Sequence, residues 1–206
     1  MPKVSPEHFK KRRAEILEAA KKVFTKKGFE PTTMQDVVKE SGMSRGGVYQ
    51  YFSSPEEMFI AIREDGFEAF DNYLRELLDT HETVWDALLA YVNNYIYEPE
   101  SEGISFGLVS YEYSVVSWRN EQHRQVILNQ ALKATETFKD FLQVGVDRGE
   151  FTPLYSLEAI ALFIFNVTDG LLLHAVFASE SANHLYINEQ VASLILYLRT
   201  ALQIRE

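Results

Sequence analysis

Apolar residues recur at helical spacing along nearly the whole of this chain. The first run places Ile16, Ala20, Val23 and Phe24 at positions i, i+4, i+7 and i+8, on one face of an α-helix. No stretch of the sequence alternates convincingly between apolar and polar residues with the period of two that is typical of a half-buried β-strand. The pattern therefore predicts an all-α protein.

Helix start and stop signals divide this pattern into elements. Ser5-Pro6 is typical of a helix start, with a serine cap and a proline in the first turn. Lys26-Lys27-Gly28 is typical of a helix end, because cations stabilise the negative end of the helix dipole and glycine adopts the left-handed cap. Thr33 and Asp36 have capping-box spacing, and Ser54-Pro55 begins a further helix. We expect helices over about 5–27, 33–40, 44–52, 55–78, 83–97, 104–119, 121–147, 156–178 and 187–204.

Charge is distributed unevenly between the two ends of the chain. The net charge is −10, yet residues 1–52 carry 11 Lys and Arg against 6 Asp and Glu, a net of +5. The remaining residues carry 9 against 24, a net of −15. A basic head on an acidic body indicates that only the head faces phosphate. The alternative is a solvated helix surface on which basic residues cluster by chance.

Residues 33–52 have the pattern of two short helices that cross steeply. Gly42 supplies the left-handed conformation that the tight turn between them requires. Val37, Met43, Val48 and Tyr51 fall where such a pair must bury apolar side chains. The alternative is a helical hairpin without a ligand.

The opposite face of the second helix suits the major groove of DNA. Arginine pairs bidentately with guanine and glutamine with adenine, while two early glycines allow the backbone to approach closely. Hydroxyl groups and the amides at helix N-termini can donate to phosphate oxygens. The predicted DNA-binding residues are Thr33, Ser44, Arg45, Gly46, Gly47, Tyr49, Gln50 and Tyr51.

Helix ends, a tight turn and an aromatic terminus coincide at fixed spacing over about residues 10–60. The residues that form this pattern are Ala14, Ile16, Leu17, Ala19, Ala20, Phe24, Gly28, Phe29, Thr32, Thr33, Met34, Val37, Gly42, Met43, Ser44, Gly47, Val48, Tyr49, Tyr51, Phe52, Glu56, Glu57 and Met58. The pattern resembles the N-terminal signature of TetR-family transcriptional regulators. Beyond residue 60 the resemblance is one of architecture, and it is greatest to the YfiR-type branch. Two positions depart from the signature: Pro55 stands where a phosphate-contacting lysine is frequent, and Val38 where a small residue is usual.

This resemblance implies a homodimer that binds a pseudo-palindromic double-stranded DNA operator and, by the family default, represses transcription until a small-molecule inducer binds. It implies a helix-turn-helix domain over residues 1–53. A connecting helix with a ligand-binding and dimerisation domain would fill residues 54–206. In the family the last two helices form the dimer. The residues expected at that interface are Ile164, Leu171, Val191, Leu194, Ile195, Leu198 and Leu202. The alternative is that these stripes close the core of one subunit, and both can hold.

The body is rich in aromatic residues, which either fill its core or line a cavity for a hydrophobic or aromatic ligand. Glu112 or Asp169, if buried near the ring faces, would favour a cationic ligand. The candidate ligand-binding residues are Tyr91, Tyr95, Tyr111, Trp118, Phe141, Asn166, Asp169 and His174.

Other classes of function find little support in the sequence. The chain has no cysteine, which excludes disulfides and thiolate chemistry, and its five histidines have no second ligand at i+3 or i+4. We therefore expect no metal, no cofactor and no enzymatic activity. The charged start and the short apolar runs predict a cytoplasmic protein that binds no membrane. The runner-up function is a helical small-molecule-binding protein whose head no longer binds DNA.

Overall fold

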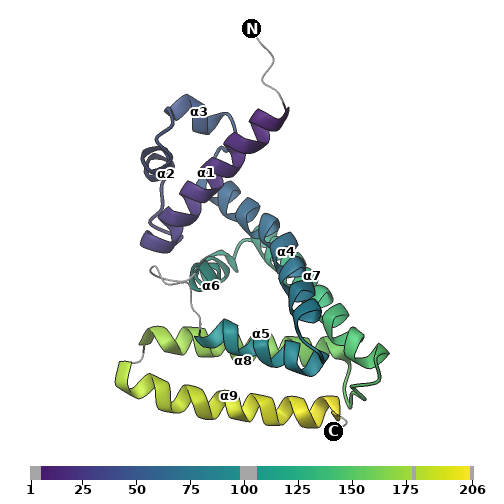
Figure 1. Ribbon diagram of the computed structural model, residues 1–206. Helices are drawn as coiled ribbons and strands as arrows, with labels where there is room; N and C mark the ends of the chain where they lie inside the picture. The colour runs from purple at the N-terminus through teal and green to yellow at the C-terminus, as the bar shows by residue number, and fades with distance from the viewer. Residues whose placement is uncertain (1–5, 98–105, 178–179, 205–206) are drawn as a thin grey trace. The chain divides into compact units, whose positions relative to one another are not determined.

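The computed structural model describes residues 6–97, 106–177 and 180–204, and these residues form helices and no strand (Figure 1). Each predicted helix is present, with ends within a few residues of the prediction except that the last begins earlier than expected. No glycine or proline interrupts residues 180–186, so the helix starts at Glu180. The helices are α1 (Pro6–Lys27), α2 (Met34–Ser41), α3 (Arg45–Tyr49), α4 (Pro55–Thr80), α5 (Val84–Tyr97), α6 (Phe106–Ser117), α7 (Glu121–Asp147), α8 (Leu157–Phe177) and α9 (Glu180–Leu202).

Two compact units share these helices. The first contains α1, α2, α3, α4 as far as Glu68, α6, and α7 as far as Arg124. Its core includes Ile16 and Phe24 of α1, Val37 of α2 and Phe59 of α4, all fully buried. The unit thus extends beyond the head of residues 1–53, because α6 packs against α1. Sequence signals are local and did not indicate this contact.

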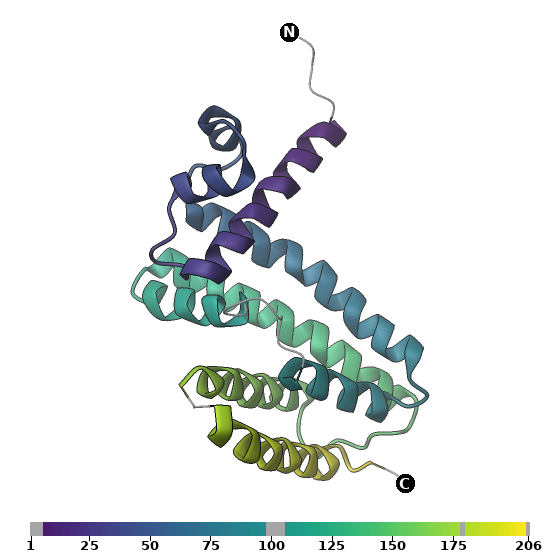
Figure 2. The same cartoon turned by 60° about the vertical axis from the view of Figure 1, so that its left-hand side comes forward.

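The second unit contains α4 from Ala69, α5, α7 from Gln125, α8 and α9. α8 and α9 lie side by side and α5 packs on α8 (Figures 1 and 2). The end of α9 is fixed by the segment before α8, since the amide of Thr152 donates to the carbonyl of Leu202 at 2.8 Å. The fully buried side chains include Leu88, Phe138, Leu142, Ile160, Ile164, Leu198 and Leu202.

One helix among the described residues, over Leu157–His174, is long and apolar enough to span a bilayer by length and composition. Ile160, Ala161 and Ile164 of this helix are fully buried in the core of the second unit. Core helices of water-soluble domains have the same composition, so the feature is weak evidence for a membrane segment.

Candidate nucleic-acid interface

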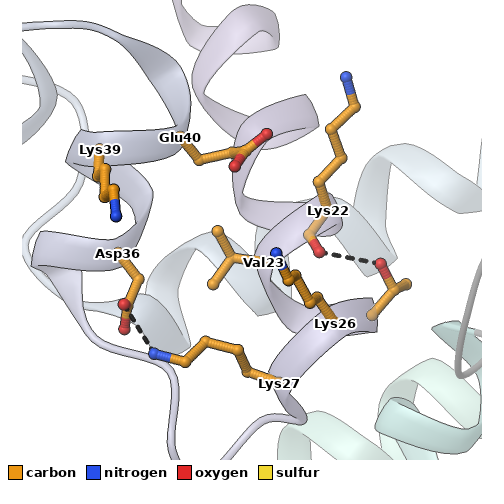
Figure 3. Close-up of a pocket in the computed structure, with 8 residues that line it drawn as sticks. Lys22, Val23, Lys26, Lys27, Asp36, Lys39 and Glu40 are labelled. Carbon is orange, nitrogen blue, oxygen red and sulfur yellow. Dashed lines mark hydrogen bonds and ion pairs between the residues drawn. The ribbon is translucent and has the colours of Figure 1, made fainter.

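The start of α2 is fixed by the predicted capping box. Thr33 has an extended backbone, and its hydroxyl accepts from the amide of Asp36 at 3.3 Å. The Asp36 carboxylate in turn accepts from the amide of Thr33 at 3.0 Å. Lys27 lies 2.7 Å from the same carboxylate (Figure 3), and its hydrogen bond, together with those from Thr33, lowers the pKa of Asp36 to about 2. Asp36 is therefore ionised at neutral pH, and it joins α1 to the start of α2.

The turn between α2 and α3 has the predicted geometry. Gly42 has φ of 65° at the end of α2, the left-handed conformation that a side chain would disfavour. Ser44 caps α3, and its hydroxyl accepts from the amide of Gly47 at 3.1 Å. A Cβ at Gly47 would lie 3.2 Å from that hydroxyl oxygen, whereas a Cβ at Gly46 would meet nothing within 4 Å. A side chain at position 47 would crowd the Ser44 hydroxyl, which explains the glycine there. A side chain at position 46 would meet nothing, so Gly46 leaves the surface of α3 open.

The face of α3 that the sequence assigned to DNA is exposed. Arg45, Tyr49 and Gln50 all point to solvent. The guanidinium carbon of Arg45 lies 5.2 Å from the centroid of the Tyr49 ring, a cation–π contact that restricts the arginine. Thr33, Ser44 and Gly46 are also exposed, so six of the eight predicted residues are accessible within one helix-turn-helix.

Tyr51 is placed differently from the other predicted contacts. Its side chain is half-buried, and its ring lies 4.5 Å from that of Phe9 on α1. This packing ties the end of the motif to the first helix. The geometry therefore gives Tyr51 a role in positioning α3, while its ring is less available to DNA than that of Tyr49.

A carboxylate of α6 holds the segment between α1 and α2, a contact that the sequence reading missed. Glu112 accepts hydrogen bonds from the amide of Phe29 at 2.8 Å and from the amide of Glu30 at 3.0 Å. Gly28 has φ of 89°, and a Cβ there would lie 2.8 Å from a Glu112 oxygen. We call these contacts the Glu112 clasp. Glu112 therefore accepts hydrogen bonds from backbone amides of the head.

Beside the clasp, Tyr113 fastens α6 to α4. Tyr113 is fully buried, and its ring centroid lies 4.8 Å from that of Phe29 and 4.9 Å from that of Phe59. Its hydroxyl donates to Glu56 at 3.1 Å, and Nδ1 of His123 lies 3.0 Å from the same carboxylate oxygen. Burial, together with the nearby Glu56 carboxylate, raises the pKa of Tyr113 to about 12. The phenol therefore remains a neutral donor across the physiological pH range.

The predicted ligand-binding residues are divided between the two units. Tyr91 and Phe141 are buried in the core of the second unit, where the Tyr91 ring packs 4.7 Å from that of Phe138. These two rings therefore follow the alternative reading, core packing. The side chain of Tyr95 lies outside the described residues. The other members of the set are exposed, on α6 of the first unit and on α8 of the second: Tyr111, Trp118, Asn166, Asp169 and His174.

Most of the predicted dimer contacts are core residues of one subunit. A different set of apolar side chains on these helices is exposed: Leu162 (45%) and Phe163 (38%) on α8, and Leu196 (67%) on α9. The periodic stripe that predicted the interface is the stripe that closes the subunit, as the alternative reading proposed. Ile195 is half-buried, and the six buried residues are Ile164, Leu171, Val191, Leu194, Leu198 and Leu202.

A glycine-turned pair of short helices, packed on a third and presenting an exposed polar face, is a helix-turn-helix of the kind that reads the major groove. Comparison with known proteins agrees. Residues 16–62 match the family described as bacterial regulatory proteins, tetR family, and residues 87–185 match the tetracyclin repressor-like C-terminal domain. The chain belongs to the TetR family of transcriptional regulators, whose members bind operator DNA as dimers.

Two relatives of the chain are transcriptional regulators. The chain is 44% identical over 207 residues to the HTH-type transcriptional regulator YfiR of Bacillus subtilis, covering 100% of this chain and 98% of that one. It is 25% identical over 169 residues to the transcriptional repressor KstR2 of Mycolicibacterium smegmatis, covering 76% of each. The fold matches a TetR-family regulator from Cytophaga hutchinsonii with a TM-score of 0.77 at 18% identity, covering 98% of this chain and 100% of that one. These matches confirm the family and the all-α fold.

Proposed function

We propose that this protein is a cytoplasmic repressor that binds a pseudo-palindromic operator through α3 and leaves it when a small hydrophobic or aromatic ligand binds. The observation that carries the operator-reading role is the exposed Arg45, Tyr49 and Gln50 face on a turn fixed by Gly42 and Ser44. Arg45 and Gln50 have the chemistry to read guanine and adenine edges.

Substitution of Arg45 tests base reading. Arg45→Ala should weaken binding to the DNA upstream of the protein's own gene by about 5- to 150-fold, the loss of one bidentate contact worth ~1–3 kcal/mol. Random DNA should be affected much less. Arg75→Ala, which removes an exposed arginine of α4 in the second unit, is the matched control. An equal loss on operator and random DNA would show that Arg45 holds only phosphate. Absence of operator binding by the wild type would favour a ligand-binding protein with an inactive head.

The release step requires a ligand that prefers one arrangement of the head over another. α4 continues from the first unit into the second, so it offers a route from a ligand in the body to the head. The Glu112 clasp, within the first unit, holds the α1–α2 segment on which such a change would act. A thermal-shift screen of apolar and cationic aromatic compounds should identify ligands that lower operator affinity by about 5- to 150-fold. Reciprocity requires that operator DNA weaken ligand binding by the same factor. Ligands that stabilise the protein without changing operator affinity would contradict this proposal.

The proposed homodimer uses the exposed side of α8 and α9. The apolar surface there comes from Leu162, Phe163 and Leu196. The Phe163 ring packs against that of Tyr197 in the same subunit, with the ring centroids 4.1 Å apart. Two heads on one dimer would read two half-sites, which one short recognition helix needs for specificity.

A further inference from the structure

A pocket between α1 and α2 has lysines at half of its lining positions (Figure 3). It has a volume of about 720 Å³, and it lies within the first unit. The figure shows Val23 between the two helices, with Lys26 and Lys27 on the α1 side and Lys39 on the α2 side. The lining residues are Lys22, Val23, Thr25, Lys26, Lys27, Asp36, Lys39 and Glu40.

The charges that line this lysine pocket are only partly compensated. Lys27 is paired with Asp36 at 2.7 Å, and Lys22 lies 3.9 Å from Glu18 with both side chains largely exposed. Within the described part of the chain, no ion pair links Lys26 or Lys39 to a carboxylate. Glu40 is the remaining opposing charge in the pocket, so its four lysines face Asp36 and Glu40 inside it and Glu18 beside it. The pocket thus carries a positive surplus that an anion would neutralise.

The lysine pocket adjoins the nucleic-acid interface through a shared residue. Asp36 lines the pocket, and its carboxylate also accepts from the amide of Thr33, the exposed cap of α2. Ammonium groups bind phosphate as strongly hydrated point charges that need no fixed geometry, which suits flexible lysines at the rim of a pocket. The position of the lysine pocket beside the nucleic-acid interface and its positive charge therefore both favour a phosphate ligand.

We propose that the lysine pocket is a phosphate-binding site, with Lys26 and Lys39 as its principal cations. The ligand is a phosphate of the operator backbone beside the bases read by α3, or a free phosphate compound with the same chemistry. Binding of an operator phosphate rests on the proposed function, whereas binding of a free phosphate compound does not. The site would add affinity without sequence preference, because phosphate contacts carry no base information.

The test neutralises the two lysines together. In Lys26→Gln/Lys39→Gln, the slope of log affinity against log salt should fall by about 1.8, since each lost phosphate contact removes ~0.9. Wild-type affinity should then drop about 12-fold more than the variant's between 50 and 200 mM salt, a factor that follows from the same slope. Operator and random DNA should lose affinity alike. Glu40→Gln removes the opposing charge and should tighten binding to both. Lys133→Gln, on α7 in the second unit, is the control.

A second arm titrates inorganic pyrophosphate into the DNA-free protein by calorimetry. Pyrophosphate binding that the double variant loses, with an unchanged DNA slope, would identify the free phosphate source. An unchanged slope and no pyrophosphate binding would overturn the site. If operator binding depends on Arg45 while both arms are negative, only this inference fails. If the wild type binds no operator, the proposed function fails and the pyrophosphate arm alone decides the site.

Discussion

Removal of the Glu112 carboxylate should loosen the segment between α1 and α2. The carboxylate accepts from the amides of Phe29 and Glu30 at 2.8 and 3.0 Å, and it fills the space that Gly28 leaves open. In Glu112→Ala both amides lose their partner. Glu112→Gln keeps one acceptor oxygen, so it should retain one of the two bonds.

The magnitude depends on how well water replaces the lost oxygens. The bond to Glu30 is exposed, so its amide recovers a bond to water at little cost, whereas the bond to Phe29 is partly buried. A hydrogen bond to a charged group contributes ~1.5–3 kcal/mol, and partial exposure places this one near the low end. Glu112→Ala should therefore lower the free energy of unfolding by about 2 kcal/mol, which corresponds to about 4–8 °C in Tm for a chain of this size. Glu112→Gln should lose about half as much.

Thermal unfolding followed by circular dichroism measures this difference. Glu76→Ala, which removes an exposed glutamate of α4 in the second unit, is the matched control for the loss of one negative charge. If Glu112→Ala unfolded within about 1 °C of that control, the clasp would contribute no stability and the reasoning from its geometry would be refuted. A Glu112→Gln variant less stable than Glu112→Ala would contradict the same reasoning.

Two further predictions concern the second unit and a helix of the first. Gly145→Ala should destabilise the protein by about 1–3 kcal/mol in chemical denaturation, because its Cβ would lie 2.3 Å from the buried Phe151 ring. At Gly66 nothing lies within 4 Å, so Gly66→Ala should instead stabilise α4 by ~1 kcal/mol. Equal effects of the two substitutions would refute the packing argument. Leu196→Glu should give a folded monomer in sedimentation, whereas Leu198→Glu should unfold the subunit because that side chain is fully buried; a stable Leu196→Glu dimer would exclude the proposed interface.

The sequence by itself determined the helices and the helix-turn-helix, because their signals are local. The Thr33 capping box, the left-handed Gly42 and the Ser44 cap each depend on residues within a few positions of one another. The choice of exposed residues on α3 followed in the same way, since the burial of Val37 and Val48 leaves the opposite face to solvent. Periodicity and caps therefore sufficed for the fold class and most of the candidate interface.

Only the tertiary structure decided what covers each apolar face. Helical spacing marked Leu194 and Leu198 as one stripe, but it could not indicate whether the same subunit or a second one covers that stripe. The Glu112 clasp joins residues 82 and 83 positions apart, and an acidic residue on a helix carries no local sign of a distant amide. The lysine pocket likewise exists because the capping-box aspartate of α2 meets the last turn of α1. Such contacts depend on how helices pack, and that is set by the whole chain at once.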